Sequence, residues 1–227
     1  MLMRVIVFGG SGVIGRAVVD ALIAGDYTVY NADLEDSGRG TFLRTDILSM
    51  HSIYRTMELV GDIYGVVNCT YPRTKRYMTD PWYDTLTDDY QTFFTQHLVS
   101  SISLMKLCRE FGVKNIVVMS SMYGKKVPEQ WMYDGTEKRK SPLEYGMAKA
   151  ALNHMVQYLS REGMHINAIA PGGIESDDMP TLFTIKYRTK ADFTKPCEVA
   201  GTVKYLLSQE GQGINGQVIT VDGGFSV

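Results

Sequence analysis

The chain has 227 residues, with 23 lysines and arginines against 25 aspartates and glutamates, for a formal net charge of −2. A hydrophobic fraction of 44% with 21% charged residues is typical of a folded globular protein and excludes a disordered chain. The balanced charge removes the electrostatic basis for nucleic acid or an anionic membrane as the main partner. No apolar run reaches the roughly 18 residues of a membrane span.

Cys69, Cys108 and Cys197 lie far apart in the sequence. Their odd number does not make a disulfide framework, and their spacing fits no zinc site, so we expect free thiols in a reducing cytoplasm and no bound metal. The first residues run from a short apolar stretch directly into glycines, so we expect no signal peptide.

Short apolar segments alternate along the chain with longer segments of helical periodicity. The predicted strands are 5–8, 27–30 (with the strand ending at 31–33), 42–43, 65–68, 115–119, 165–169 and 217–221. The predicted helices include 12–24, 91–111 and 142–161. Strands that are apolar throughout are typical of a sheet covered on both faces. The alternation predicts the α/β class: a Rossmann-type, doubly wound parallel sheet in a single domain over residues 1–227.

Three stretches without clear periodicity, 71–88, 124–141 and 172–195, each follow a predicted strand. Ligands of open α/β sheets bind outside the carboxyl ends of the strands. We therefore expect these stretches to form the walls of an active site.

Glycines recur at three-residue intervals between the first predicted strand and the first predicted helix, at Gly9, Gly12 and Gly15. Glycine at such a junction permits a tight turn, lets backbone N–H groups approach a pyrophosphate and lets the helix pack against the sheet. The pattern predicts a dinucleotide site, and the alternative is a turn with a purely structural role.

Asp33 stands at the end of the second predicted strand, eighteen positions after Gly15. An acidic side chain there accepts hydrogen bonds from the adenosine ribose and repels the additional phosphate of NADP. The sequence therefore predicts NAD in preference to NADP, although Arg16, Arg39 and Arg44 are nearby cations that would favour the phosphate. Asp46, after the third strand, suits a contact with the adenine amino group.

The helix predicted from Pro142 carries a tyrosine and a lysine four residues apart, Tyr145 and Lys149. Ser141 as N-cap, Pro142 in the first turn and Glu144 three residues after the serine match a capping box. At that spacing the two side chains lie on one helical face. A nearby ammonium and the positive helix start are expected to lower the pKa of the phenol and make it usable for acid–base chemistry. On spacing alone, a tyrosine and a lysine four residues apart are usually an ordinary pair of solvated side chains.

With these motifs in this order, the sequence resembles the short-chain dehydrogenase/reductase family over essentially its whole length. The resemblance rests on the N-terminal glycine turn, Asn68, Ser121 to Gly124, Tyr145 to Lys149, residues 167–173 and residues 216–224. It implies that Tyr145 is the general acid and base and that Ser121 binds the substrate oxygen. It implies further that Lys149 lowers the pKa of the tyrosine and holds the nicotinamide ribose.

The resemblance also implies the cofactor contacts. Asn68 would line the cofactor cleft, Pro171 and Gly172 would border the nicotinamide, and Ser176 would replace a threonine that contacts the pyrophosphate. The predicted cofactor-binding residues are Gly9, Ser11, Gly12, Val13, Ile14, Gly15, Asp33, Asp46, Ile47, Asn68, Cys69, Tyr145, Lys149, Pro171, Gly172, Ile174 and Ser176.

The chain departs from the family pattern at several positions. Val13 replaces a glycine, and Asn68-Cys69-Thr70-Tyr71 replaces Asn-Asn-Ala-Gly. Cys69 is interpreted as a small apolar filler beside the cofactor rather than a nucleophile. His97 aligns with the family asparagine that fixes a water for proton relay, and it is predicted as a fourth catalytic residue. The alternative for His97 is a structural hydrogen bond.

Tyr71-Pro72-Arg73 and residues 127–136 resemble a branch that accompanies bacterial surface-glycan and flagellin-modification sugar pathways. Basic residues in these loops could meet a phosphate, and Trp131 and Tyr133 could stack on a sugar or pack the loop down. The basic residues are Arg73, Lys75, Arg76, Lys125 and Lys126.

The sequence thus predicts an NAD-dependent oxidoreductase that interconverts a secondary alcohol and a ketone, with a sugar, sugar phosphate or nucleotide sugar as candidate small-molecule substrate. The alternatives are a non-catalytic NAD-sensing or scaffold protein on the same fold and a reductase of acyl substrates, which the polar loops disfavour.

We also expect a symmetric dimer or tetramer, because the helices 91–111 and 142–161 carry more apolar residues than one sheet face can cover. The residues behind this expectation are Phe93, Phe94, Leu98, Ile102, Leu104, Met105, Leu107, Leu152, Met155, Val156 and Leu159.

Overall fold

Seven parallel strands form one sheet in the order β3-β2-β1-β4-β5-β6-β7 in the computed structural model, which describes residues 3–72, 86–113, 115–135, 141–175 and 181–227. The strands are β1 (Arg4–Phe8), β2 (Thr28–Asp33), β3 (Thr41–Arg44), β4 (Gly65–Asn68), β5 (Asn115–Met119), β6 (His165–Pro171) and β7 (Val218–Val221). This confirms the predicted fold class. The strand order reverses between β1 and β4, which is where open α/β sheets bind their ligands.

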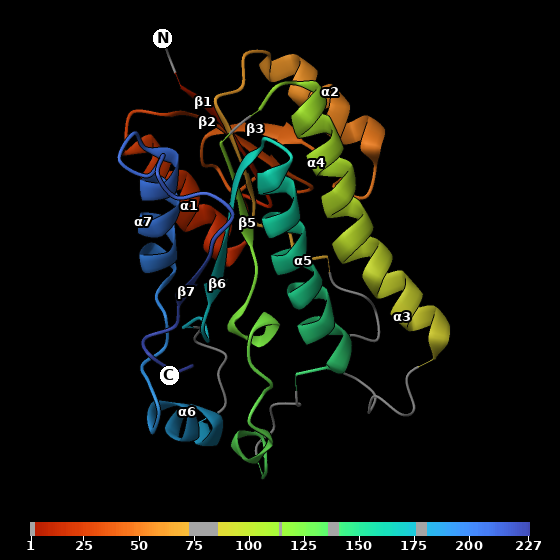
Figure 1. Cartoon of the computed structure of the whole chain (residues 1–227). Helices are drawn as coiled ribbons and strands as arrows, with labels where there is room; N and C mark the ends of the chain where they lie inside the picture. The colour runs from red at the N-terminus through yellow and green to blue at the C-terminus, as the bar shows by residue number, and fades with distance from the viewer. Residues whose placement is uncertain (1–2, 73–85, 114, 136–140, 176–180) are drawn as a thin grey trace.

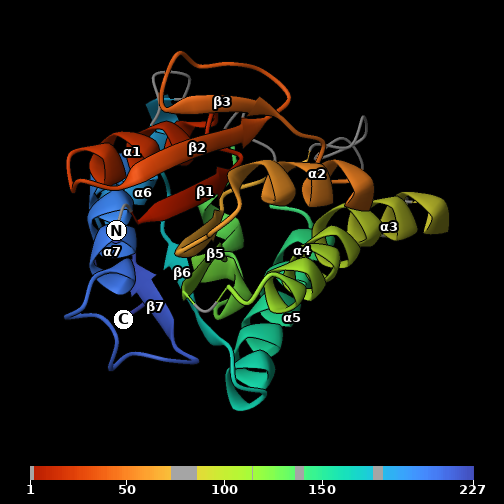
Figure 2. The ribbon, with the colours of Figure 1, turned by 90° about the horizontal axis from the view of Figure 1, so that it is seen from above.

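Helices cover both faces of the sheet, as Figure 2 shows from above. The helices are α1 (Val13–Ile23), α2 (Met50–Val60), α3 (Thr87–Phe94), α4 (Ser100–Glu110), α5 (Leu143–Arg161), α6 (Thr181–Arg188) and α7 (Pro196–Leu207). One face packs against α1 and α7 and the other against α2, α4 and α5 (Figure 1). The central strands, such as β1 and β4, are buried along almost their whole length between these layers, which explains their continuously apolar sequences, whereas the edge strands β3 and β7 are partly exposed.

The predicted helix 91–111 differs from the structure at its start and in its middle. The helix begins at Thr87, and residues Thr95–Val99 form a π-helical turn between α3 and α4. The hydroxyl groups of Ser100 and Ser101 donate to the carbonyls of Gln96 and His97, four residues earlier. Such bonds compete with the α-helical backbone ladder, which accounts for the altered winding at this point.

The predicted cap of α5 is wrong in detail. The helix begins at Leu143, Pro142 has an extended backbone at the N-cap, and no side chain caps the helix. The backbone of Ser141 instead hydrogen-bonds the phenol of Tyr133. Tyr145 lies in the first turn of α5, as predicted. The start of the helix is held by the contact between Ser141 and Tyr133 and not by a side-chain cap.

The stretch 172–195 is not irregular throughout, because it contains α6. Phe183 and Tyr187, one turn apart on α6, are buried in a third core outside the sheet. That packing stabilises a helix of eight residues that would be marginal in isolation. The stretch 124–141 likewise contains a short 3₁₀ turn, Gln130–Met132.

Candidate active site

The glycine turn between β1 and α1 has no room for a larger residue at Gly9 or at Gly15. A Cβ on Gly9 would lie 2.7 Å from backbone atoms of Cys69 and Thr70, and φ at Gly9 is +77°. A Cβ on Gly15 would lie 2.0 Å from the carbonyl oxygen of Gly9. The turn thus packs tightly against β4 and against the start of α1, as the glycine spacing predicts.

The N-terminus of α1 is available to an anion. Its N-cap, Gly12, has no side chain, and no acidic residue stands in the first turn. A Cβ at Gly12 would meet only the Gly9 carbonyl, at 3.4 Å, and Val13 is half exposed. The first N–H groups of a helix have no intrahelical partner, so this end fits a pyrophosphate.

Asp33 is built into this cradle. One carboxylate oxygen accepts a hydrogen bond of 2.9 Å from the backbone N–H of Ser11, and the other accepts 2.7 Å from Leu34. The Ser11 hydroxyl donates to the carbonyl of Glu35 and accepts from Asn31. The Asp33 carboxylate therefore lies directly beside the glycine turn.

The remaining predicted cofactor residues lie along the same edge of the sheet. Asp46 bonds the N–H of Leu48 and Ile47 packs on the core. Gly172 donates to Val221, and Ile174 pairs with Thr194 beyond β6. A Cβ on Gly172 would lie 2.8 Å from Asp222. Ser176 lies outside the described residues.

Asn68, at the end of β4, is buried, and both the oxygen and the nitrogen of its side-chain amide are hydrogen-bonded. Its amide oxygen accepts from the N–H and hydroxyl of Thr70, and its nitrogen donates to Ser101. The adjacent Cys69 has a thiol whose pKa burial raises to about 12. A thiol that stays protonated is a poor nucleophile, which agrees with the interpretation of Cys69 as an apolar filler.

Ser121, Tyr145 and Lys149 come together where β5 ends and α5 begins. The Ser121 and Tyr145 hydroxyls are hydrogen-bonded. The Lys149 ammonium lies 5.8 Å from the centre of the Tyr145 ring and donates a bond of 2.8 Å to the carbonyl of Met119. The closeness of α5 to the loop after β5 requires Gly124, where a Cβ would lie 2.8 Å from the Lys149 backbone.

The pKa of Tyr145 is not lowered, contrary to the expectation from its spacing to Lys149. Burial raises the pKa of Tyr145, although the bond from Ser121 partly lowers it. Burial also lowers the pKa of Lys149 to about 8. Loss of hydration is the largest influence on the pKa of the Tyr145 phenol, and it favours the protonated form.

His97, in the π-helical turn, is buried and faces the same site. Its ring stacks on Phe93 with centroids 4.1 Å apart and hydrogen-bonds the carbonyl of Pro72. Burial, and then the charge of Lys149, lower the pKa of His97 to about 4. The imidazole is therefore neutral at physiological pH.

A small internal cavity, with room for about one water molecule, lies between β4, the π-helical turn and α5. Asn68, Gln96, His97, Ser101 and Lys149 are among its lining residues. Within the described chain, the Gln96 Oε1 and His97 Nε2 atoms have no hydrogen-bond partner although both are buried. The other cavity-lining polar groups make this a suitable place for a bridging water.

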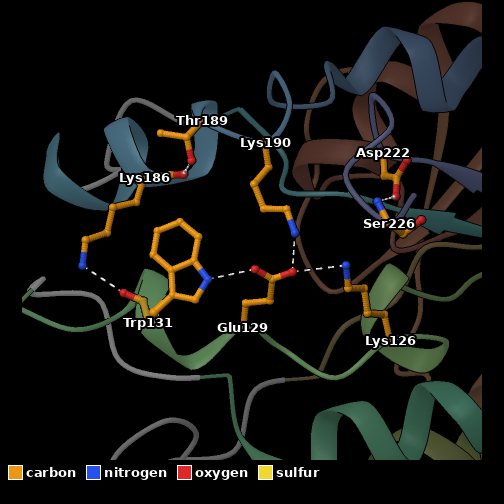
Figure 3. Close-up of polar contacts among 8 residues, drawn as sticks. All are labelled: Lys126, Glu129, Trp131, Lys186, Thr189, Lys190, Asp222 and Ser226. Atoms are coloured by element: carbon orange, nitrogen blue, oxygen red, sulfur yellow. Dashed lines mark hydrogen bonds and ion pairs between the residues drawn. The ribbon is translucent and has the colours of Figure 1, made fainter.

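The loop after β5 is fastened to α6 by an ionic cluster (Figure 3). The Glu129 carboxylate accepts hydrogen bonds from Lys190 and from the indole N–H of Trp131, and it forms an ion pair with Lys126. These partners, of which Lys190 has the largest effect, lower the pKa of Glu129 to about 2. Lys186 donates to the Trp131 carbonyl. Lys126 is thus engaged within the protein, and Lys125 bonds Thr220. Arg73, Lys75 and Arg76 lie outside the described residues.

Beneath this cluster lies an aromatic core that the sequence reasoning missed. The Tyr187 ring stacks on Phe193 and Phe225, with centroids 4.2 and 4.6 Å apart, and its hydroxyl accepts from the N–H of Gly173. Tyr133 is buried in this core, whereas Trp131 is half exposed. Two roles were predicted for these residues, stacking on a sugar or packing the loop down, and Tyr133 has the second. The spacing of Phe183 and Tyr187 was the signal available in the sequence.

No group of three His, Cys, Asp or Glu side chains that could hold a metal occurs in the described parts of the chain. Nor do those parts contain a helix long and apolar enough to cross a membrane.

Curated relatives resemble the chain over its whole length. Post-translational flagellin modification protein A of Campylobacter coli is 27% identical, covering 100% of both chains. The 3-oxoacyl-[acyl-carrier-protein] reductase FabG of Vibrio harveyi is 24% identical, covering 96% of this chain and 95% of the relative.

Solved structures have the same fold. A short chain dehydrogenase from Leptospira borgpetersenii with bound NAD+ superposes with a TM-score of 0.85 at 25% identity, over 100% of this chain and 94% of the other. A short chain dehydrogenase from Burkholderia cenocepacia in complex with NADP gives a TM-score of 0.82 at 22% identity, over 99% and 98%.

A family model described as enoyl-(acyl carrier protein) reductase matches residues 13–226. That match leaves out only the first twelve residues and the last one, and it includes Ser121, Tyr145 and Lys149. The chain belongs to the short-chain dehydrogenase/reductase family.

Proposed function

We propose that the protein is an NAD(H)-dependent oxidoreductase that interconverts a secondary alcohol and a ketone. The observation that carries the proposal is the hydrogen-bonded Ser121–Tyr145 pair with the Lys149 ammonium 5.8 Å from the phenol ring. This group lies at the carboxyl edge of the sheet, on which the glycine turn also opens. Membership in an oxidoreductase family supports the same conclusion.

Each residue of the group has a separate task. A bound nicotinamide supplies or takes up the hydride. Tyr145 gives its proton to the carbonyl oxygen during reduction and takes it back during oxidation. Ser121 donates a hydrogen bond to that oxygen as charge develops on it. The buried Lys149 binds the ribose hydroxyls and stabilises the phenolate once the proton has left.

We infer that NAD is the physiological cofactor. The Asp33 carboxylate, held beside the glycine turn by Ser11, would lie where the ribose 2′-hydroxyl binds. Solved relatives of the same fold are described with either NAD+ or NADP, so family membership alone supports only a nicotinamide dinucleotide.

Replacing Asp33 by Ser should narrow the preference for NADH over NADPH by roughly 10-fold or more, because the repulsive charge is removed. Asp33→Asn is the matched variant, since it keeps an acceptor for Ser11 while losing the charge. Both dissociation constants can be measured by fluorescence titration. An unchanged preference in both variants would assign the discrimination to Arg16 or Arg39 instead.

We propose that His97 is the fourth catalytic residue, holding a relay water in the cavity beside Lys149. His97 lines that cavity, and its buried Nε2 atom has no hydrogen-bond partner among the described residues. The hydrogen bond from the ring to the Pro72 carbonyl holds the imidazole in place. The bond to Pro72 also supports the structural alternative, and one histidine can fill both roles.

Replacing His97 by Phe should lower kcat by about 10-fold, whereas His97→Asn, which can still bind water, should keep most of the activity. Since the pKa of His97 lies near 4, the wild-type profile of kcat should show no titration from this residue between pH 5 and 8. Equal losses of thermal stability with unchanged kcat in both variants would leave only the structural role.

We further propose a polar substrate, with sugars, sugar phosphates and nucleotide sugars as the first candidates. The similarity to a flagellin modification protein over the full length supports this class. The acyl alternative has support from the names of other relatives, which include acyl-carrier-protein reductases.

The deciding experiment is a substrate screen that follows NADH absorbance in both directions. Sugar phosphates and nucleotide sugars form one panel, and acyl thioesters form the other. Turnover on the first panel supports the proposal, and turnover on acyl thioesters alone would replace it. Tight NADH binding without turnover on either panel would favour the NAD-sensing or scaffold alternative.

The apolar residues behind the expected dimer or tetramer are mostly used inside the subunit. Phe93, Leu104, Met105, Leu107, Leu152 and Val156 are buried in the single chain. A different stripe, called here the α4–α5 stripe, is exposed on α4, on α5 and on the π-helical turn that precedes α4. It is formed by Val99, Ile102, Leu143, Met147 and Tyr158. We propose that two copies pack through this α4–α5 stripe, since its α5 members recur at helical spacing on one face.

Replacing Met147 by Glu should shift the mass measured by light scattering toward 25.4 kDa, the mass of one chain, because it places a charge in the stripe. Leu59→Glu, at an exposed position on α2 outside the stripe, is the control. A wild-type mass of one chain at micromolar concentration would contradict the proposed assembly.

A further inference from the structure

Tyr71 makes a set of contacts that the family resemblance does not account for. It follows β4, where the family pattern has glycine. Its ring meets that of Tyr145 edge-on, with centroids 5.7 Å apart and an interplanar angle of 90°. The Lys149 ammonium lies 5.8 Å from the centre of the Tyr71 ring, the same distance as from the ring of Tyr145.

The position of Tyr71 is fixed by its contact with His97. His97 lies 5.1 Å from its ring, stacks in turn on the buried Phe93 and hydrogen-bonds the carbonyl of the next residue, Pro72. The π-helical turn thus supports a chain of rings that runs from α3 to Tyr145. A loop residue that follows a strand would otherwise be held only by its backbone.

The ring of Tyr71 covers the Tyr145–Lys149 pair on the side of β4. The Tyr145 phenol faces the Ser121 hydroxyl from the loop after β5 and the phenols of Tyr123 and Tyr133 from the same region. Lys149 faces the Cys69 thiol and His97. No carboxylate is among these partners, so exclusion of water is the main influence on the proton of Tyr145.

We propose that Tyr71 is a positioning residue that shields the Tyr145–Lys149 pair from water and so raises the pH up to which Tyr145 remains a proton donor. The inference rests on Tyr145 being the proton donor of the proposed reaction. Removal of the ring admits water, which stabilises the phenolate and the ammonium together. The raised pKa of Tyr145 in the closed site agrees with this direction.

The test is an NMR titration of protein labelled with ¹³Cζ-tyrosine, with the Tyr145 resonance assigned by Tyr145→Phe. It needs no substrate, so it remains decisive even if the proposed activity fails. In wild type and in Tyr71→Phe, which keeps the ring, the Tyr145 signal should stay unshifted up to about pH 10. In Tyr71→Ala its midpoint should fall by roughly one pH unit or more relative to wild type.

Tyr71→Ser serves as a second opening variant if Tyr71→Ala does not fold, and Tyr205→Ala, at an exposed position on α7 outside the proposed α4–α5 stripe, is the control for loss of a tyrosine. Once a substrate is known, the pH at half-maximal alcohol oxidation should fall in the opening variants and stay unchanged in Tyr71→Phe. An identical titration of Tyr145 in wild type and opening variants, or a Tyr71→Phe titration that matches Tyr71→Ala, would overturn the proposal.

Discussion

Replacing Tyr145 by Phe should lower kcat by at least ~10²-fold while the dissociation constant for NADH changes by no more than about 3-fold. The substitution removes the proton donor and the bond to Ser121 but keeps the ring, which packs edge-on against Tyr71. Turnover is measured with the substrate found by the screen, and NADH binding by fluorescence.

Tyr205→Phe is the matched control, because it makes the same chemical change at an exposed position on α7, outside the site and outside the proposed α4–α5 stripe. It should leave both constants unchanged. Near-normal turnover in Tyr145→Phe would refute the assigned mechanism, and the proton would then have to come from another group in the site.

Replacing Lys149 by Met should abolish most turnover, again by at least ~10²-fold, and at the same time stabilise the protein at neutral pH. The lysine is buried, and burial lowers its pKa from 10.5 to about 8. Between these values the unfolded chain binds a proton that the folded chain does not, so stability rises with pH across this window. Below about pH 8 the full cost of the buried ammonium, about 3 kcal/mol, is present.

The methionine removes that cost but also the charge-assisted bond to Met119, which contributes about 2 kcal/mol. The net gain of about 1 kcal/mol should raise Tm at pH 7 by roughly 2–4 °C, and the gain should shrink toward pH 10.5. Calorimetry at both pH values checks this, with Lys106→Met on the exposed face of α4 as control. A lower Tm of Lys149→Met than of the wild type at pH 7 would show that Lys149 stabilises the folded state and does not destabilise it.

The positions of the strands along the chain followed from the sequence to within a few residues, because the central strands are apolar along almost their whole length. The segments 5–8 and 65–68 match β1 and β4 closely. Helices were harder to delimit wherever their ends depend on distant contacts. The start of α5 depends on a contact between Ser141 and Tyr133, and α6 depends on an aromatic core formed with Phe225, far along the chain.

The sequence by itself determined the local features of this protein. These are the glycine turn, the acidic end of β2 and the Tyr145–Lys149 spacing, all of which depend on residues within a few turns of one another. Only the tertiary structure decided the state of the catalytic pair. Burial, to which β4, β5 and the π-helical turn contribute, outweighs the single ammonium on the same helix and raises the pKa of Tyr145. Hydration depends on everything that surrounds a group, and no spacing along the chain specifies that.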